Sequence, residues 1–340
     1  NLQTTTLNNQ HTGHIQAQIA EIKVTDQLVN AKEINAEQNL TIQAGKLDNT
    51  GKIQTNQVLT VTTEQGNLDN SGTISSEKGS GTITVVTGTL KNSKVIKSYH
   101  NLTVRVEQGL LENNSQFIAE QQLDLRAQRI DNKGEMVGRV AAIITTTDSL
   151  TKSHIIGSAK DLTLNVGGQL KNKDKGKIGQ VRGQLKLNAY SLHNEGELFF
   201  SPASTTGSLD TLQVTDFIYN QGAIKASGGL HLEALKRIEN RGMIVAEKNL
   251  GLKAPTIQHL SGLIQSNQGD LRLDATTRLY NADILNVCKG TLTITTNHLD
   301  NHTDIKLDKD LILNIQNLDN SCTIGAKGTF QLLKLQTLIN

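Results

Sequence analysis

The sequence predicts an all-β protein, a right-handed parallel β-helix of about 16 coils with a period near 20–21 residues. A seven-residue pattern recurs along the whole chain: an apolar residue, a variable residue, Asn, often Gly two positions later, and an apolar residue four positions after the Asn. An alternating apolar pair, typical of a strand, follows about ten residues after the Asn. No segment carries the sustained i, i+3, i+4, i+7 apolar stripe of a helix.

The asparagine of each copy marks the period. Asn340 lies 331 positions after Asn9, and 16 intervals separate them, which gives a mean period of about 20.7 residues. Two copies carry Lys152 and His259 where the others carry Asn. The intervals stay close to this mean except for a single longer one, which separates the markers at positions 194 and 220.

The apolar residues four positions after each marker predict the interior. Ile34, Ile53 and Ile74 are examples in three successive copies. One copy is too small to bury its apolar face alone, whereas stacked copies bury it against each other. We therefore expect one copy per coil, coils about 4.8 Å apart, and aliphatic ladders inside with Lys, Glu, Gln and Thr outside.

The marker asparagine is expected at a corner between strands. Asn tolerates the left-handed backbone conformation, its amide bonds nearby backbone, and stacked amides bond each other along the coils. Glycine two residues later, as at Gly51 and Gly72, is expected to supply a second flexible corner position. The residues predicted to form this structural corner ladder are Asn30, Asn49, Asn70, Asn92, Asn113, Asn132, Asn172, Asn194, Asn220, Asn240, Asn281, Asn301 and Asn320.

Composition narrows the function classes. The chain has 340 residues, a formal net charge of +2 and 3% aromatic residues with no Trp. Near-balanced charge argues against nucleic acid as a partner. Small aliphatic residues at regular spacing fit a thin stacked core better than a large globular one. Two prolines agree with a backbone held in sheet ladders, and two cysteines form no disulfide framework.

The long interval that ends at position 220 is the main candidate for recognition. We expect a loop insertion over residues 199–216, because Ser201–Ser208 is rich in turn-forming residues. Aromatic side chains are enriched at recognition hot spots, and loops on a rigid scaffold often carry function. The alternative is a tolerated insertion beside an ordinary corner strand. The residues proposed for a recognition loop are Phe199, Phe200, Pro202, Phe217 and Tyr219.

The remaining polar features have simpler structural explanations. Lys171–Lys177 forms a basic bulge that would contact anionic glycan or lipopolysaccharide, or else a solvated turn. His298 and His302 have the spacing of metal ligands on a helix, but their segment reads as strand and turn, so no metal site is expected. Acidic residues beside the markers, such as Asp48 and Asp69, follow the repeat and not a catalytic pattern. We expect no enzyme activity, catalytic residue or cofactor.

The Leu-x-Asn-x-Gly-x-Ile…Leu-x-Leu pattern, seen at Leu47–Ile53 and repeated once per period along the chain, resembles the haemagglutinin repeats of filamentous haemagglutinin. The same repeats build the stalks of contact-dependent growth inhibition effectors. Both are large exoproteins of Gram-negative bacteria. The secretion-domain Asn-Pro-Asn motif and the Val-Glu-Asn-Asn motif that precedes toxin domains are absent from this chain.

The resemblance implies the function to expect. Residues 1–340 would form a single β-helical repeat segment, an interior fragment of a larger exoprotein, secreted or held at the cell surface. Its work would be adhesion, by extending and displaying contact surfaces. Its partners would be an outer-membrane two-partner secretion transporter, flanking coils of the same polypeptide, and a receptor or glycan on a host cell or target bacterium. The alternative is a stalk or receptor-binding segment of a contact-dependent growth inhibition effector that delivers a toxin.

Overall fold

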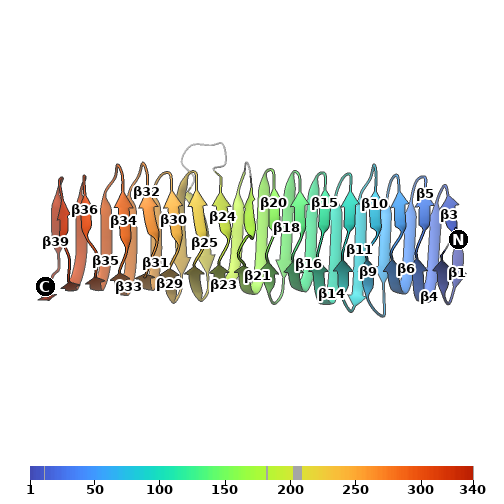
Figure 1. Cartoon of the computed structure of the whole chain (residues 1–340), viewed down its shortest axis with the longest axis horizontal. Helices are drawn as coiled ribbons and strands as arrows, with labels where there is room; N and C mark the ends of the chain where they lie inside the picture. The colour runs from blue at the N-terminus through green and yellow to red at the C-terminus, as the bar shows by residue number, and fades with distance from the viewer. Residues whose placement is uncertain (11, 181–182, 202–208, 340) are drawn as a thin grey trace. The chain divides into compact units, whose positions relative to one another are not determined.

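The computed structural model is a parallel β-solenoid of about 16 turns, which confirms the predicted fold class (Figure 1). It describes residues 1–10, 12–180, 183–201 and 209–339. All 40 regular elements within these ranges are β-strands. No helix in the described residues is long and apolar enough to span a membrane.

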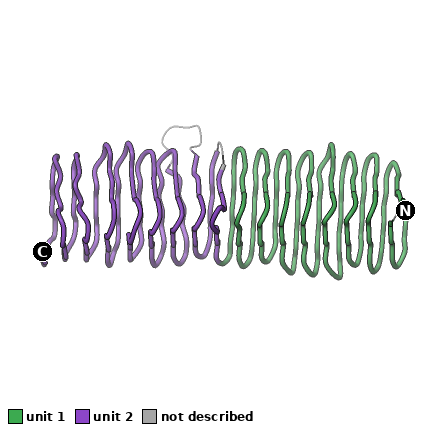
Figure 2. Tube along the Cα trace, in the orientation of Figure 1, with its two compact units in different colours: residues 1–168 green, residues 169–340 purple. Residues whose placement is uncertain are grey.

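The chain divides into two compact units, unit 1 at Asn1–Gly168 and unit 2 at Gln169–Asn340 (Figure 2). Each unit contains two parallel sheets. The long strands belong to the first sheet, and the chain passes from them to short strands of the second sheet and back again. The first sheet of unit 1 contains β1 (Leu2–Thr4), β2 (Leu7–Asn9), β4 (Ala20–Asn30), β6 (Leu40–Asn49), β8 (Leu59–Thr63), β9 (Leu68–Asn70), β11 (Gly81–Thr87), β12 (Leu90–Asn92), β14 (Leu102–Asn113), β16 (Gln122–Asn132), β18 (Ala141–Thr146), β19 (Leu150–Lys152) and the start of β21 (Asp161–Asn172). Its second sheet contains β3 (His14–Ala17), β5 (Glu33–Ala36), β7 (Lys52–Thr55), β10 (Thr73–Ser76), β13 (Val95–Ser98), β15 (Gln116–Ala119), β17 (Glu135–Gly138) and β20 (Ile155–Ser158).

Unit 2 repeats the same arrangement. Its first sheet contains β23 (Leu185–Asn194), β25 (Leu209–Val214), β26 (Phe217–Asn220), β28 (Gly229–Ala234), β29 (Arg237–Asn240), β31 (Leu250–His259), β33 (Leu271–Asn281), β35 (Leu292–Asn301), β37 (Leu311–Asn320), β39 (Phe330–Leu333) and β40 (Thr337–Ile339). Its second sheet contains β22 (Lys177–Gln180), β24 (Glu197–Phe200), β27 (Ala223–Ala226), β30 (Met243–Ala246), β32 (Leu263–Ser266) and β34 (Ile284–Val287). A separate pair contains β36 (Ile305–Leu307) and β38 (Ile324–Ala326).

Each coil has three inward-facing segments. A long strand such as β14 has one buried alternation at its start and another at its end, with exposed residues between them. Its pairing with β16 shifts register between Val106 and Leu110, where the strand bends. A short turn follows the marker asparagine and leads into the second sheet, whose strands supply the third face. Side chains of alternate residues from all three segments therefore point into one interior.

The interior consists of like residues stacked in register. Ile34 pairs with Ile53, and Ile53 with Ile74, and all three side chains are fully buried. In unit 2, Ile224 pairs with Ile244 in the same way. Full burial of an aliphatic side chain is worth roughly 1.5–3 kcal/mol, so each position of these ladders stabilises the coils.

The corner glycines are needed for close packing and not for a left-handed turn. A Cβ at Gly72 would lie 1.9 Å from the carbonyl oxygen of Gly51 in the preceding coil. Neither residue has positive φ, so the flexibility expected of them is not what the fold uses. The left-handed conformation expected of the marker asparagines is also wrong. Among the described residues, the non-glycine residues with positive φ are Lys175 and Lys334.

The range expected for the loop insertion, residues 199–216, is too wide at both ends. Phe199 and Phe200 belong to β24, and Leu209–Val214 forms β25. Both segments pair with strands of the following coil. They keep the strand conformation because alternate side chains, such as that of Phe200, fill the core. Pro202 and the rest of residues 202–208 lie outside the described residues.

Candidate functional site

The marker asparagines of unit 1 form a directional chain of side-chain hydrogen bonds inside the coils. The side-chain Nδ2 of Asn30 donates to Oδ1 of Asn49 over 2.8 Å, and Asn49 donates in the same way to Asn70 over 2.8 Å. Further Nδ2–Oδ1 distances of 2.7–2.9 Å join Asn9 to Asn30, Asn70 to Asn92, Asn92 to Asn113, and Asn113 to Asn132. We call this feature the amide ladder.

Unit 2 carries the amide ladder in two stretches. Nδ2–Oδ1 distances of 2.7–2.8 Å join Asn172, Asn194, Asn220 and Asn240 in one stretch and Asn281, Asn301 and Asn320 in the other. We call each asparagine side chain of the amide ladder a rung. Many rungs also donate to backbone, as Asn49 does to the carbonyl oxygens of Gly51 and Thr73. Each amide is buried, so these bonds satisfy groups that would otherwise be costly inside the protein.

Lys152 and His259 interrupt the amide ladder with titratable side chains. Lys152 is fully buried, its Nζ donates to the carbonyl oxygen of His154 over 2.8 Å, and burial lowers its pKa to about 6. His259 is 1% exposed, and burial is the main cause of its lowered pKa. Both side chains are therefore held where the neutral form is favoured.

The aromatic residues proposed for recognition do not form one patch. Phe199 is 37% exposed on β24 of the second sheet, whereas Phe217 and Tyr219 are half-buried on β26 of the first. Phe200 is fully buried, so its assignment to a recognition surface is corrected. The ring of Tyr219 packs against His193, with 4.7 Å between centroids and planes tilted by 51°.

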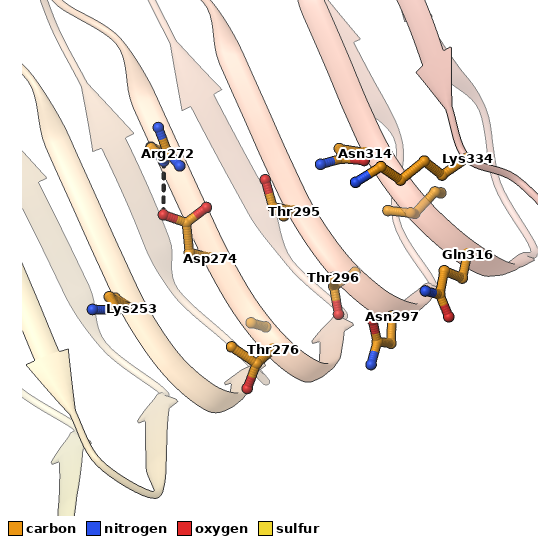
Figure 3. Close-up of a pocket in the computed structure, with 12 residues that line it drawn as sticks. Lys253, Arg272, Asp274, Thr276, Thr295, Thr296, Asn297, Asn314, Gln316 and Lys334 are labelled. Atoms are coloured by element: carbon orange, nitrogen blue, oxygen red, sulfur yellow. Dashed lines mark hydrogen bonds and ion pairs between the residues drawn. The ribbon is translucent and has the colours of Figure 1, made fainter.

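A polar groove on unit 2 is a surface feature that the sequence pattern does not reveal. It has a volume of about 410 Å³ and lies over β31, β33, β35 and β37, where the long strands bend (Figure 3). Pairing in register places Lys253, Asp274, Thr295 and Asn314 in one row across these four strands. Thr276, Asn297, Gln316 and Lys334 also line the groove.

The chemistry of the groove is that of a hydrogen-bonding surface. Arg272 Nε donates to Oδ2 of Asp274 over 2.7 Å, as the dashed line in Figure 3 marks. Oδ1 of Asp274 and Oδ1 of Asn314 are buried acceptors for which the described residues supply no donor. Lys253 bonds Glu233 over 2.8 Å beside the groove. Hydroxyl, amide and charged groups lie here beside apolar surface, so a ligand in the groove would meet hydrogen-bonding groups together with apolar contacts.

The other polar candidates from the sequence take ordinary structural places. The backbone of Lys173 and Gly176 closes a turn at 2.9 Å within the basic bulge. His298 bonds Asp300, and the ring of His302 lies 5.1 Å from that of Tyr280. The described residues contain no group of three or more His, Cys, Asp or Glu side chains placed to hold a metal ion. Cys288 and Cys322 are free cysteines.

The acidic residues beside the markers do stack, as their spacing suggests. Asp48 and Asp69 are register partners, and Gln27 donates to Asp48 over 2.6 Å. Burial, and then the charge of Asp48, raise the pKa of Asp69. This acidic pair lies on the outward face of the first sheet.

Asp210 is a buried acid that the pattern did not reveal. It is 6% exposed and pairs in register with Leu230, so it occupies a position of the apolar ladder. Burial raises its pKa to about 6, and its Oδ2 has no partner in the described structure. The irregular interval before Asp210 obscures the register of its strand. Its position two residues before Leu212 is nevertheless a signal, because strand alternation places both side chains on the same face.

Stacked coils, apolar ladders and an amide ladder define the class of protein, which is a repetitive parallel β-solenoid. The chain belongs to the haemagglutinin repeat family. The family model matches residues 1–72, 98–174 and 203–283, which together make up more than half of the chain. The resemblance predicted from the repeated seven-residue pattern is thereby confirmed.

Known relatives include a toxin and a nuclease. Toxin CdiA of Escherichia coli is 28% identical over 185 residues, which cover 45% of this chain and 6% of that protein. The tRNA nuclease CdiA of Escherichia coli strain NC101 is 26% identical over 185 residues, again 45% of this chain and 6% of that protein. The chain thus spans only a small part of the relatives it matches. No solved structure matches it.

Proposed function

We propose that this chain is a structural and adhesive segment of a secreted two-partner-secretion exoprotein at the surface of a Gram-negative cell. The observation that carries the proposal is the amide ladder inside a haemagglutinin-repeat solenoid. Such coils add length without needing a larger core, and they hold outward side chains at fixed spacing. The segment would extend from the cell and display contact surfaces to a receptor or glycan, after export through an outer-membrane transporter.

A second candidate function is supported by the comparisons. Because relatives of the chain include the toxin CdiA of Escherichia coli, the segment would serve as a stalk, or as a receptor-binding part, of an effector that delivers a toxin to a neighbouring cell. In both functions the coils themselves would carry no catalytic group. The two differ in what the rest of the exoprotein does once contact is made.

The polar groove is the contact surface we propose to test first. Thr295→Trp would fill it, and Thr62→Trp is the matched control, because Thr62 is a half-buried, outward-facing threonine in the equivalent part of β8 in unit 1. Beads coated with each variant would be incubated with host cells and with target bacteria. The proposal expects wild type and Thr62→Trp to adhere and Thr295→Trp to lose most adhesion. If the wild-type protein adheres neither to host cells nor to target bacteria, the adhesive role is overturned.

The stalk function is tested by shortening the solenoid within a full-length exoprotein. Deleting residues 31–70 removes two whole copies and leaves Asn30 followed by Asn92 in the amide ladder. Deleting residues 31–60 removes one and a half copies and puts later strands out of register. Killing of neighbouring cells that survives the first deletion and fails with the second supports the stalk. Killing that survives both excludes it.

A further inference from the structure

We propose that His259 makes unit 2 proton-sensitive: protonation of its buried ring breaks the rung that links Asn240 to the following coil. This inference concerns a conformational device in the fold and goes beyond the proposed function. It rests on the directions of the hydrogen bonds made by His259, on the side-chain oxygen of Asn281 that His259 leaves unpaired, and on the burial of these two side chains.

The hydrogen bonds around His259 fix one neutral tautomer. Its Nε2 lies 3.0 Å from the carbonyl oxygen of Ile284, which only accepts, so Nε2 carries the proton. Its Nδ1 lies 3.2 Å from Nδ2 of Asn240, which only donates, so Nδ1 accepts. A proton added at Nδ1 would place two donors against each other in a site that is 1% exposed.

The amide of Asn240 cannot turn over to relieve that conflict. Its Oδ1 accepts from Asn220 over 2.8 Å, and its Nδ2 donates to the carbonyl oxygen of Gly242 over 2.9 Å. A reversed amide would face a donor with its nitrogen and a carbonyl with its oxygen. Protonation therefore costs either the bond to His259 or the two bonds on the other side of the rung.

The following rung shows that the histidine already interrupts the amide ladder. Asn281 is paired in register with His259, and its side chain is fully buried. Its Oδ1 would receive a hydrogen bond from an asparagine at position 259, but among the described residues it has no donor. The only N–H of the neutral ring donates to Ile284, so this acceptor stays unpaired.

The charges around the ring do not cancel the effect. Asp283, in the turn before β34, is the charged group that acts on His259, and it favours the protonated form. One of its carboxylate oxygens accepts from the backbone N–H of Gly262 over 2.7 Å. Burial outweighs Asp283 and the backbone bonds, so the pKa of His259 lies below its ordinary value of 6.5. Glu239 and Arg241, on either side of Asn240, bond each other over 2.8 Å.

The sign of the pH dependence follows from the lowered pKa. The unfolded chain takes up the proton near pH 6.5, and the folded chain takes it up only at lower pH. Stability from the neutral ring is therefore full above pH 6.5. It falls as the pH drops toward the folded-state pKa, and the loss is complete below that value. In this window the unfolding equilibrium constant rises by up to tenfold per pH unit for one proton.

The test compares urea unfolding of the 340-residue chain at pH 7.5, 6.0 and 5.0. His259→Asn should rejoin the amide ladder, raise the urea midpoint at pH 7.5, and remove the part of the pH dependence that comes from this proton. His14→Asn removes an exposed histidine of unit 1 and is the matched control, expected to keep the wild-type dependence. If wild type and His259→Asn lose stability in parallel from pH 7.5 to 5.0, the proposal is overturned.

A second measurement uses the unsubstituted protein, so it does not depend on folding of a variant. Nitrogen-15 chemical shifts of the histidine rings distinguish the two neutral tautomers and follow each titration. The resonance assigned to His259 by comparison with His259→Gln should show a protonated Nε2 and titrate below pH 6.5 together with a change at the Asn240 side-chain amide. A ring with a protonated Nδ1, or one that titrates while the Asn240 amide is unchanged, contradicts the proposal.

Discussion

The side-chain nitrogen of Asn49 lies 2.8 Å from the side-chain oxygen of Asn70 in the next coil, and both side chains are buried. From Asn30 to Asn113, each amide in this line accepts from the preceding marker asparagine and donates to the next one. Because the donor always points toward the C-terminal coil, the line has one direction, and a side chain that does not both accept from the preceding amide and donate to the next one interrupts it. The amide ladder therefore fixes the register of the coils with polar contacts inside an apolar core.

Removing one rung should destabilise the coils around it. Asn49→Ala deletes the bond from Asn30, leaves Oδ1 of Asn70 without its donor, and costs about 2–3 kcal/mol of unfolding free energy. Asn35→Ala is the control, since Asn35 faces outward on β5. Urea unfolding monitored by circular dichroism measures both. Equal midpoints for the two variants would show that the rung adds no stability.

A charged side chain in the apolar ladder should lower the free energy of unfolding more than the loss of one rung does. Ile244 is fully buried between Ile224 and Ile264, so Ile244→Asp would bury an unpaired carboxylate and cost several kcal/mol, on the order of 4 kcal/mol or more. Met243→Asp, one residue away on the outward face, should change the melting temperature little. A melt in which the two substitutions have the same effect would place Ile244 outside the core.

Lys152 should make unit 1 more stable as the pH rises above neutral. Its pKa is lowered from 10.5 to about 6, so the unfolded chain binds a proton that the folded chain lacks between these values. Stability should rise by as much as about 1.4 kcal/mol per pH unit from pH 7 toward pH 9. Lys152→Met should lack this rise, because it removes the titrating amine. Lys133→Met, at an exposed lysine, should retain it. A wild-type midpoint that does not change over this range would contradict the burial of a neutral lysine.

Asp210 should have the opposite dependence on pH. Its pKa is raised to about 6 from an ordinary value of 3.8, so the fold disfavours its charged form. Stability is expected to be full below pH 3.8, to fall as the pH rises to about 6, and to stay lower above that. Asp210→Leu should stabilise unit 2 at pH 7 by roughly 2–3 kcal/mol, whereas Thr211→Leu, on the exposed side of β25, should not. Urea unfolding of both variants at pH 7 tests this prediction. If Asp210→Leu is less stable than wild type, the carboxylate stabilises the fold and the prediction is wrong.

The sequence predicts those parts of the fold that repeat. Ile53 and Ile74 are found in the stacked core because an apolar residue at a fixed offset in every copy has one explanation, burial against its counterparts. The backbone conformation of the marker asparagines is not predictable in the same way. A left-handed corner and a buried strand end place Asn at the same offset, and only the structure distinguishes them.

The irregular parts are predicted less well for a different reason. Phe200 is expected in a loop, although it lies two residues after Leu198 and alternation places it inside. The polar groove lies where four long strands bend. At this bend β33 has one residue more than β31 and β35, but that difference in spacing does not by itself predict a groove. Asp210 escapes prediction because the long interval before Asn220 obscures which copy its strand continues.

The measurement that tests the amide ladder most directly is hydrogen exchange of asparagine side-chain amides, followed by nitrogen-15 NMR of the chain at neutral pH. The account predicts that the amide protons of Asn30, Asn49 and Asn70 persist long after that of Asn35 has exchanged, because the three are buried and bonded from coil to coil. Exchange of the ladder amides at the rate of Asn35 would contradict it.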